Sequence, residues 1–130
     1  WIYSSLSFFI FYLIGKIFSI KSLWYHLFSV IFHCFNTLFV RILSKILKVR
    51  TEISLISAGI FAVHPIHTEA VASIMSMPEK FMFFFAMLSF IMFLSKTKLN
   101  LLYSSIFYFA AISSKEPAVI LIPVYFILYI

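Results

Sequence analysis

The sequence predicts an all-α integral membrane protein, and three observations support this fold class. Of its 130 residues, 64% are hydrophobic and only 11% are charged, and the mean hydropathy of +1.11 is far above that of soluble domains. The apolar runs are longer than the strands of about ten alternating residues that build membrane barrels. Only 2 glycines accompany 18 phenylalanines, which argues against a flexible coil. The apolar runs are therefore predicted to be transmembrane helices.

The charged residues are few and dispersed. The formal net charge is +6, and the 10 Lys and Arg residues stand in short breaks between apolar runs. No basic patch gathers them, so nucleic acid is not an expected partner. The expected partner is the lipid bilayer, in which the basic breaks orient the helices. Cys34 is the only cysteine, so no disulfide can form within the chain.

Hydropathy divides the chain into apolar spans at residues 5–20, 23–44, 53–63, 81–95, 99–113 and 117–130. These spans predict about five transmembrane helices, preceded by span 5–20. Gly15 and Lys16 interrupt that first span, which leaves open whether it crosses the membrane or lies in the interface. Because a straight crossing needs about 20 residues, span 53–63 is expected to begin earlier, near Lys48.

Two prolines predict helix boundaries. Pro65 has no amide hydrogen and disfavours helical geometry at His64, so a helix should end there. The next helix is expected to carry Thr68 or Glu69 in its first turn. Pro117 suits the first turn of the final helix.

The charges also predict the orientation of the helices. The breaks 41–50 and 96–100 are rich in Lys and Arg and contain no acidic residue. By the positive-inside rule both breaks are cytoplasmic. The polar segments HPIHTE, SMPEK and SSKEPA then lie together on the opposite side, and they contain Glu69, Glu79 and Glu116.

Charged residues on that side are candidates for function, although each could also be structural. An ionisable group at the centre of a membrane helix costs about 2.5–3.5 kcal/mol, and the cost falls near the interface. Glu79 and Lys80, which open span 81–95, could therefore be helix-end residues that face water. Lys115 and Glu116 are adjacent, so they point to different sides of a helix and need not pair. Lys115 could instead neutralise a phosphate.

The histidines offer a second set of candidates. His64, His67 and Glu69 could bind a divalent metal or the phosphate of a ligand. Because a proline interrupts the two histidines, their spacing fixes no ligand geometry, and no metal site is assigned. His26 and His33 share a face of the preceding long span, where hydrogen-bonded packing is expected.

Several segments, taken in order, resemble a known family: YHLFSVIFHCFN, GIFAVHPIHTEAVASI, EKFMFFFAMLSFIMFL and ISSKEPAVILIPV. They resemble the membrane part of the transmembrane and tetratricopeptide-repeat O-mannosyltransferases, which are GT-C-type enzymes that use a dolichyl-phosphate sugar. The resemblance extends from about Trp24 to Tyr129. It implies a multi-helix GT-C transmembrane bundle in the endoplasmic reticulum, with the polar segments in the lumen and span 5–20 as an interfacial helix.

The resemblance also implies that residues 1–130 are an internal fragment of one glycosyltransferase domain. The first lumenal loop, with its catalytic acids, is expected before Trp1, and the repeats are expected after Ile130. The family has an arginine where this chain has Met77, followed two positions later by an acid that is retained as Glu79. Glu79 is therefore the candidate for active-site polarity or metal contact, although the main base is expected upstream. The candidates for substrate binding are Lys115 for the phosphate, with Glu116, His64, His67 and Glu69 shaping the site.

These observations lead to the hypothesis that the protein transfers mannose from dolichyl-phosphate mannose to Ser or Thr hydroxyls of secretory and membrane proteins. A hydroxyl nucleophile needs a general base, and the leaving phosphate needs charge stabilisation. Participation of a divalent metal stays open. Two alternatives are a non-catalytic membrane anchor of a repeat-containing interaction protein and a transporter or channel. Charges gathered on one side of the membrane, rather than strung across it, argue against a transporter.

Overall fold

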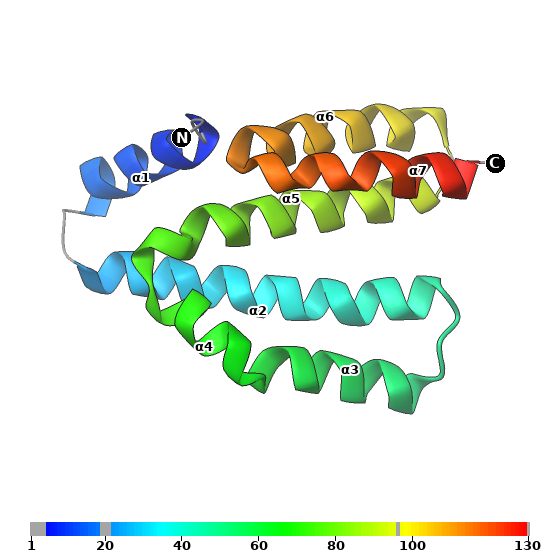
Figure 1. Ribbon diagram of the computed structural model, residues 1–130, viewed down its shortest axis with the longest axis horizontal. Helices are drawn as coiled ribbons and strands as arrows, with labels where there is room; N and C mark the ends of the chain where they lie inside the picture. Colours follow the sequence, from blue (N-terminus) through cyan, green and yellow to red (C-terminus); the bar gives the residue numbers. More distant parts are fainter. Residues whose placement is uncertain (1–4, 19–21, 96, 130) are drawn as a thin grey trace.

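The computed structural model describes residues 5–18, 22–95 and 97–129; the side chains of residues 18, 68–71, 74, 128 and 129 are outside this description. All of the described regular structure is helical, as predicted (Figure 1). The elements are α1 (Ser5–Phe18), α2 (Ser22–Ile46), α3 (Thr51–Val63), α4 (Pro65–Ala72), the 3-10 helix η1 (Ile74–Ser76), α5 (Met77–Leu94), α6 (Lys98–Ser114), the 3-10 helix η2 (Glu116–Ile120) and α7 (Leu121–Tyr129).

The helices form two groups that meet along α2 and α5 (Figure 1). In the first group, α2 and α3 run antiparallel, and α4 returns from the end of α3 toward α5. In the second group, α5 and α6 are closely packed, and η2 and α7 lie beside them. α1 packs against the end of α6 and makes smaller contacts with α2 and α5.

Several helix starts differ from the sequence-based prediction. Pro117 lies in the 3-10 helix η2 rather than in the first turn of the final α-helix, which begins at Leu121. α3 begins at Thr51 rather than near Lys48, because Lys48 adopts a left-handed backbone with φ 57° that ends α2. The amide of Val49 donates to the carbonyl of Ser44 at 3.0 Å, which satisfies one of the last carbonyls of α2. α4 begins at Pro65 itself, so Thr68 lies at the end of its first turn and Glu69 beyond it. Proline is well suited to the first helical position, where no amide hydrogen is needed.

Two described helices, α2 and α5, are long and apolar enough to cross a membrane. Only 11% of the apolar window in α2 and 22% of that in α5 is buried, whereas a core helix of a soluble protein is mostly buried. α1 has 14 residues, fewer than the roughly 20 of a straight crossing. Residues 1–4 and 19–21, on either side of α1, lie outside the described residues, so this length does not decide between a crossing and an interfacial helix.

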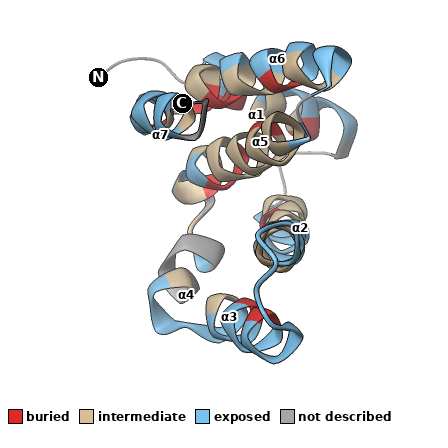
Figure 2. Cartoon of the chain, turned by 90° about the vertical axis from the view of Figure 1, so that its right-hand side faces the viewer, coloured by how far each residue is buried: buried red, intermediate tan, exposed pale blue. Residues whose placement is uncertain are grey.

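The distribution of side chains is inverted relative to a soluble domain. Large apolar side chains cover the outward faces of the helices, while burial is confined to short patches between helices (Figure 2). The buried polar residues are Ser7, Ser29, Asn36, Ser54, Lys80, Ser89, Ser104 and Ser114. Small serines let membrane helices approach closely and hydrogen-bond to one another. Between α5 and α6, Ser89 Oγ donates to the Ser104 carbonyl at 2.8 Å and Ser104 Oγ donates to the Ser89 carbonyl at 2.9 Å.

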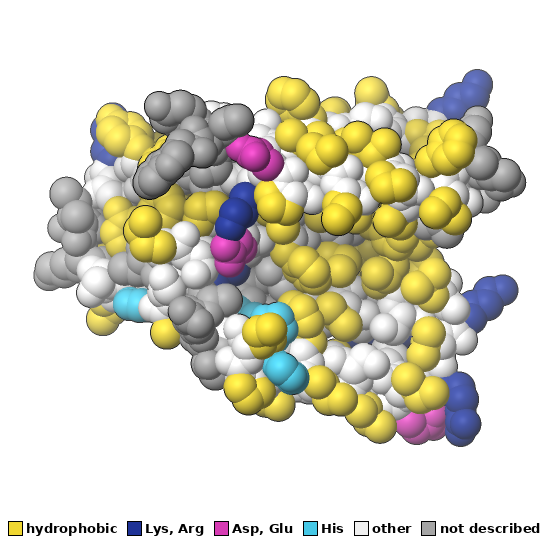
Figure 3. All heavy atoms as spheres, viewed as in Figure 1, with side chains coloured by type: hydrophobic (Ala, Val, Ile, Leu, Met, Phe, Trp, Pro, Cys, Tyr) yellow, Lys and Arg dark blue, Asp and Glu magenta, His cyan; other side chains and the backbone are white. Residues whose placement is uncertain are grey.

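The two ends of the molecule differ in charge. Lys and Arg side chains gather at the right-hand end in Figure 3, where the α2–α3 and α5–α6 connections lie in Figure 1. Acidic, basic and histidine side chains gather toward the opposite end, around the start of α5. The structure therefore separates the basic breaks 41–50 and 96–100 from the polar segments, as the charge pattern predicts; residue 96 itself lies outside the described residues.

Candidate functional site

The first turn of α5 carries the acidic residue of the candidate site. Pro78 stands at the start of this helix, and Glu79 follows in its first turn, where the helix dipole favours a negative charge. Lys115 leaves the end of α6 in an extended conformation with φ −162° and ψ 139°, and its ammonium donates a hydrogen bond to Glu79 Oε1. The Lys115 and Glu79 side chains are 39% and 48% exposed. This ion pair ties the start of α5 to the junction between α6 and η2.

A cavity of about 330 Å³ lies beside Glu79, between α2, the α3–α4 corner and α5. We call it the polar cavity; its lining residues are His33, Asn36, Phe61, His67, Glu79, Lys80, Met82 and Phe83. The structure thus brings together Glu79 and His67, which the sequence selected as candidates. It adds His33, which was interpreted as a packing residue, and Lys80, which was interpreted as a helix-end residue. It also adds Asn36, which the sequence analysis did not select.

Lys80 is buried although it follows an exposed glutamate at a helix start. Its side chain is only 6% exposed, and its Nζ donates to Ser29 Oγ of α2 at 2.6 Å. Among the described residues, the ion pairs within 4.0 Å are Lys115 with Glu79 and Arg50 with Glu52, so none of them includes Lys80. Lys80 therefore lines the polar cavity together with the Glu79 carboxylate, whose own ion pair is with Lys115.

Asn36 lies within α2 and is 3% exposed. Its Nδ2 donates to the carbonyl of Lys80 at 3.3 Å, which links α2 to the first turn of α5. Its Oδ1 has no hydrogen-bond partner among the described residues. A buried amide oxygen without a donor is uncommon in native proteins and calls for an explanation. The only signal in the sequence is an asparagine inside an apolar span.

The histidines line a second cavity, of about 410 Å³, which we call the histidine cavity. All 4 histidines of the chain contribute to it: His26 and His33 from α2, His64 from the α3–α4 corner and His67 from α4. His33 and His67 also line the polar cavity, so the two cavities adjoin there. His33 Nε2 lies 3.1 Å from the Ala62 carbonyl, which agrees with the packing role expected for this residue.

His67 lies beside two aromatic rings at the junction of the two cavities. Its ring centroid lies 4.4 Å from that of Phe61 and 5.6 Å from that of His33. Burial, followed by the nearby charges of His33 and His64, lowers the pKa of His67 below its ordinary value. A neutral imidazole can accept a proton or a hydrogen bond from a ligand.

The histidines do not converge on a metal. Within the part of the chain that the structure describes, no group of three or more His, Cys, Asp or Glu side chains is arranged to hold an ion. His64 Nδ1 accepts a hydrogen bond from the Ile66 amide at 3.2 Å, so one ring nitrogen is already occupied.

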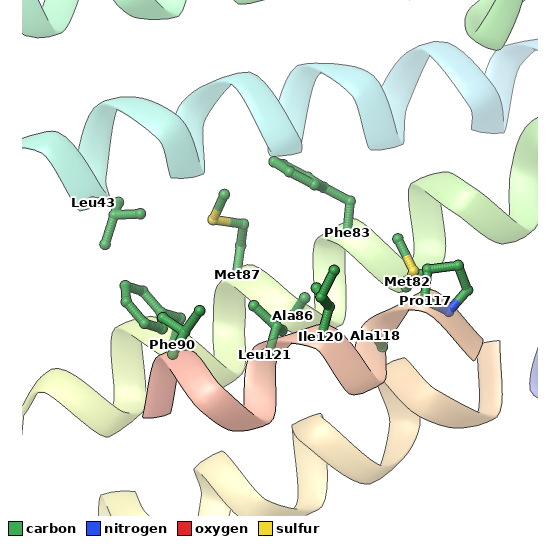
Figure 4. Close-up of a pocket in the computed structure, with 11 residues that line it drawn as sticks. Leu43, Met82, Phe83, Ala86, Met87, Phe90, Pro117, Ala118, Ile120 and Leu121 are labelled. Carbon is green, nitrogen blue, oxygen red and sulfur yellow. The ribbon is translucent and has the colours of Figure 1, made fainter. Parts of the chain in front are cut away.

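An apolar groove of about 300 Å³ adjoins the polar cavity. It is lined by Leu43, Met82, Phe83, Ala86, Met87, Phe90, Pro117, Ala118, Ile120, Leu121 and Val124. Phe83 and Met87 point from α5 toward α2, and η2 and the start of α7 close the other side (Figure 4). Met82 and Phe83 line both the groove and the polar cavity, so an apolar space and a polar space meet at one turn of α5.

The remaining predicted residues lie outside the polar cavity. His64 lines the histidine cavity, and Glu116 is an exposed residue in the first turn of η2. The backbone of Glu69 lies in α4, but its side chain is outside the described residues. Met77, at the position of the family arginine, is 1% exposed and packs with Ile14 and Phe81.

Comparisons with protein families, with curated proteins and with solved structures found no match to this chain.

Proposed function

We propose that this chain is part of a polytopic membrane glycosyltransferase of the GT-C type that takes a sugar from a polyprenyl-phosphate donor. The donor that the sequence resemblance favours is dolichyl-phosphate mannose, and the acceptors are Ser or Thr hydroxyls of secretory and membrane proteins. In this proposal the basic connections face the cytoplasm, and the polar cavity faces the lumen of the endoplasmic reticulum.

One observation carries the proposal: the apolar groove and the polar cavity share Met82 and Phe83. A polyprenyl-phosphate sugar is amphipathic in the same way, with an isoprenoid tail joined to a charged, hydroxyl-rich head group. The groove extends from the polar cavity along α5 to Phe90 and to Leu43 of α2. A tail in the groove would place the head group in the polar cavity, at the end of the bundle opposite the basic connections.

The polar cavity also supplies charge of both signs for such a reaction. Departure of the phosphate requires stabilisation of negative charge, and cations in a low-dielectric site provide it effectively. Lys80 lies in the cavity, and Lys115 stands at its rim, paired with Glu79. We assign to Glu79 the role of supplying the negative charge of the polar cavity. The main base is expected from a part of the protein before Trp1.

The histidine cavity gives a route for the acceptor. It meets the polar cavity at His33 and His67, on the side away from the apolar groove's Phe90 and Leu121. A hydroxyl entering through the histidine cavity would approach a head group held in the polar cavity. His64 and His67, which line the histidine cavity, would then shape the acceptor side.

The second candidate function is a non-catalytic membrane anchor for appended repeats. The replacement of the family arginine by Met77 favours it, because Met77 is packed in an apolar cluster and is not among the residues that line the polar cavity. The two functions differ in a measurable way. We would assay the full-length protein in membranes that lack related transferases, supplying labelled dolichyl-phosphate mannose and following label into protein.

Transfer by the wild-type protein, above that of membranes without it, would support the glycosyltransferase. Absence of transfer by a protein that elutes as a single folded species would favour the anchor. Dolichyl-phosphate glucose serves as a matched donor. If label were transferred from it and not from dolichyl-phosphate mannose, the protein would still be a glycosyltransferase, but its sugar would be glucose rather than mannose.

A further inference from the structure

The polar cavity contains a hydrogen-bond acceptor that no described residue satisfies. Asn36 Oδ1 is buried and without a partner, although Asn36 lines the cavity. The hydrogen bond from Asn36 Nδ2 to the Lys80 carbonyl fixes the orientation of the amide. Exchanging the amide nitrogen and oxygen would place two acceptors against each other. The free oxygen therefore calls for a donor such as a ligand hydroxyl.

The same cavity contains a buried cation. Lys80 Nζ has three hydrogens to donate, and Ser29 Oγ accepts one of them at 2.6 Å. Glu79, the nearest carboxylate in sequence, forms its ion pair with Lys115. Burying an ammonium that forms no ion pair of its own within 4.0 Å of a described residue is unfavourable, so an anion in this cavity would be attracted to it.

The size and walls of the cavity limit the ligand. Its volume of about 330 Å³ is near the lower end of small-molecule sites, which range from roughly 300 to 1,000 Å³. Phe61 and Phe83, whose ring centroids lie 5.5 Å apart, provide an apolar wall. This space suits one sugar ring beside an anion and is too small for an oligosaccharide.

We propose that Asn36 and Lys80 bind the sugar-phosphate head group: Asn36 Oδ1 accepts a hydrogen bond from a sugar hydroxyl, and Lys80 Nζ donates to the phosphate. This inference rests on the proposed function and adds selectivity to it. Asn36 makes the site prefer a phosphate that carries a sugar over the bare polyprenyl phosphate. Lys80 makes it prefer either phosphate over the uncharged polyprenol.

The test is equilibrium binding to the full-length protein in nanodiscs of neutral phosphatidylcholine. The probes are short-chain polyprenyl-phosphate mannose, polyprenyl phosphate and polyprenol. Asn36→Leu keeps the size of the side chain and removes the acceptor, and it should weaken binding of the phosphosugar about tenfold or more while leaving that of polyprenyl phosphate unchanged. Lys80→Met should weaken binding of both phosphates and leave that of polyprenol unchanged.

Matched controls separate these effects from general disturbance. Thr37→Val changes the next residue of α2, whose hydroxyl is already bonded to the His33 carbonyl at 3.0 Å. Lys98→Met removes an exposed lysine at the start of α6, at the basic end. Both controls should bind like wild type. The ratio of the affinities for polyprenyl-phosphate mannose and polyprenyl phosphate, measured on one preparation, does not depend on the fraction of protein that is folded. Asn36→Ala is a second variant without the acceptor, on which the same ratio is measured.

The outcomes distinguish the inference from the proposed function. Wild-type protein that binds neither phosphate would overturn both. Wild-type protein that binds the phosphosugar, with an unchanged ratio in both Asn36 variants, would overturn the role of Asn36 and leave the proposed function intact. Unchanged binding of both phosphates by Lys80→Met would likewise overturn the role of Lys80.

Discussion

Removing the charge of Glu79 should separate a small effect on stability from a larger effect on sugar transfer. The partner of Glu79, Lys115, is 39% exposed and Glu79 itself 48% exposed, so solvent screens their attraction. Pairs of this kind contribute about 0.2–1 kcal/mol, and an acid in the first turn of a helix contributes about 0.3–1 kcal/mol. Glu79→Gln should therefore lower the free energy of unfolding by no more than about 2 kcal/mol.

The effect on transfer should be larger because Glu79 is the only carboxylate among the described residues that line the polar cavity. We expect Glu79→Gln to lower kcat/KM at least tenfold, which corresponds to about 1.4 kcal/mol or more of transition-state stabilisation. Lys115→Met removes the same ion pair and leaves the carboxylate in the cavity. It should also lower transfer, because Lys115 is the proposed phosphate contact, and the double variant separates the two roles.

Both quantities can be measured on the same proteins. Unfolding in mixed micelles by detergent titration gives the stability of each single variant and of the double variant, and the cycle isolates the coupling between the two charges. Transfer of labelled mannose at matched expression gives kcat/KM. Full transfer by Glu79→Gln would remove Glu79 from the mechanism. A double variant that transfers as well as either single variant would mean that the ion pair, rather than the carboxylate by itself, is required.

Three further predictions concern the scaffold. Ser104→Leu should lower the free energy of unfolding by about 1–3 kcal/mol, because Ser104 is buried against α5. Ser105→Leu, on the exposed side of α6, should change it by less than about 0.5 kcal/mol in the same detergent titration. Since the pKa of His67 is lowered in the folded protein, the unfolded chain binds the proton more readily, and stability should fall as pH decreases from about 7 through 6.5. His67→Phe should flatten this dependence in melting curves between pH 7.5 and 5.5, and an unchanged pH dependence would contradict it. Lys48→Gly should raise the melting temperature slightly, because glycine adopts the left-handed backbone at φ 57° without the cost borne by lysine; a decrease would mean that the side chain is needed there.

The order and type of the helices follow from local features of the sequence. Apolar runs, charged breaks and prolines act within one element, so the end of α3 before Pro65 was predictable. The start of α3 was not, because it depends on the left-handed turn at Lys48, a conformation that sequence ordinarily assigns to glycine. α2 and α5 are long and apolar enough to cross a membrane, and which helices cross it stays a prediction.

The site was predictable only where its residues carry charge. Glu79 and His67 stand out because charges are rare in this chain and gather near one end. Lys80 and Asn36 join the site through the packing of α2 against α5, which places their partners Ser29 and the Lys80 carbonyl across a helix interface. No periodicity within one helix reveals such a contact. For the same reason, Lys115 gave no sign in the sequence of its pairing with Glu79.

The central claim is that one lipid-linked sugar occupies the apolar groove and the polar cavity together, and photo-crosslinking tests it most directly. The probe is a polyprenyl-phosphate mannose with a diazirine in its tail, bound to the full-length protein in nanodiscs and mapped by peptide mass spectrometry. We predict labelling within 82–90 of α5 and 117–124 of η2 and α7, abolished by excess unlabelled polyprenyl-phosphate mannose. Labelling spread equally over the exposed apolar residues of α3, such as Ile53, Ile56 and Ile60, and unaffected by the competitor, would contradict the claim.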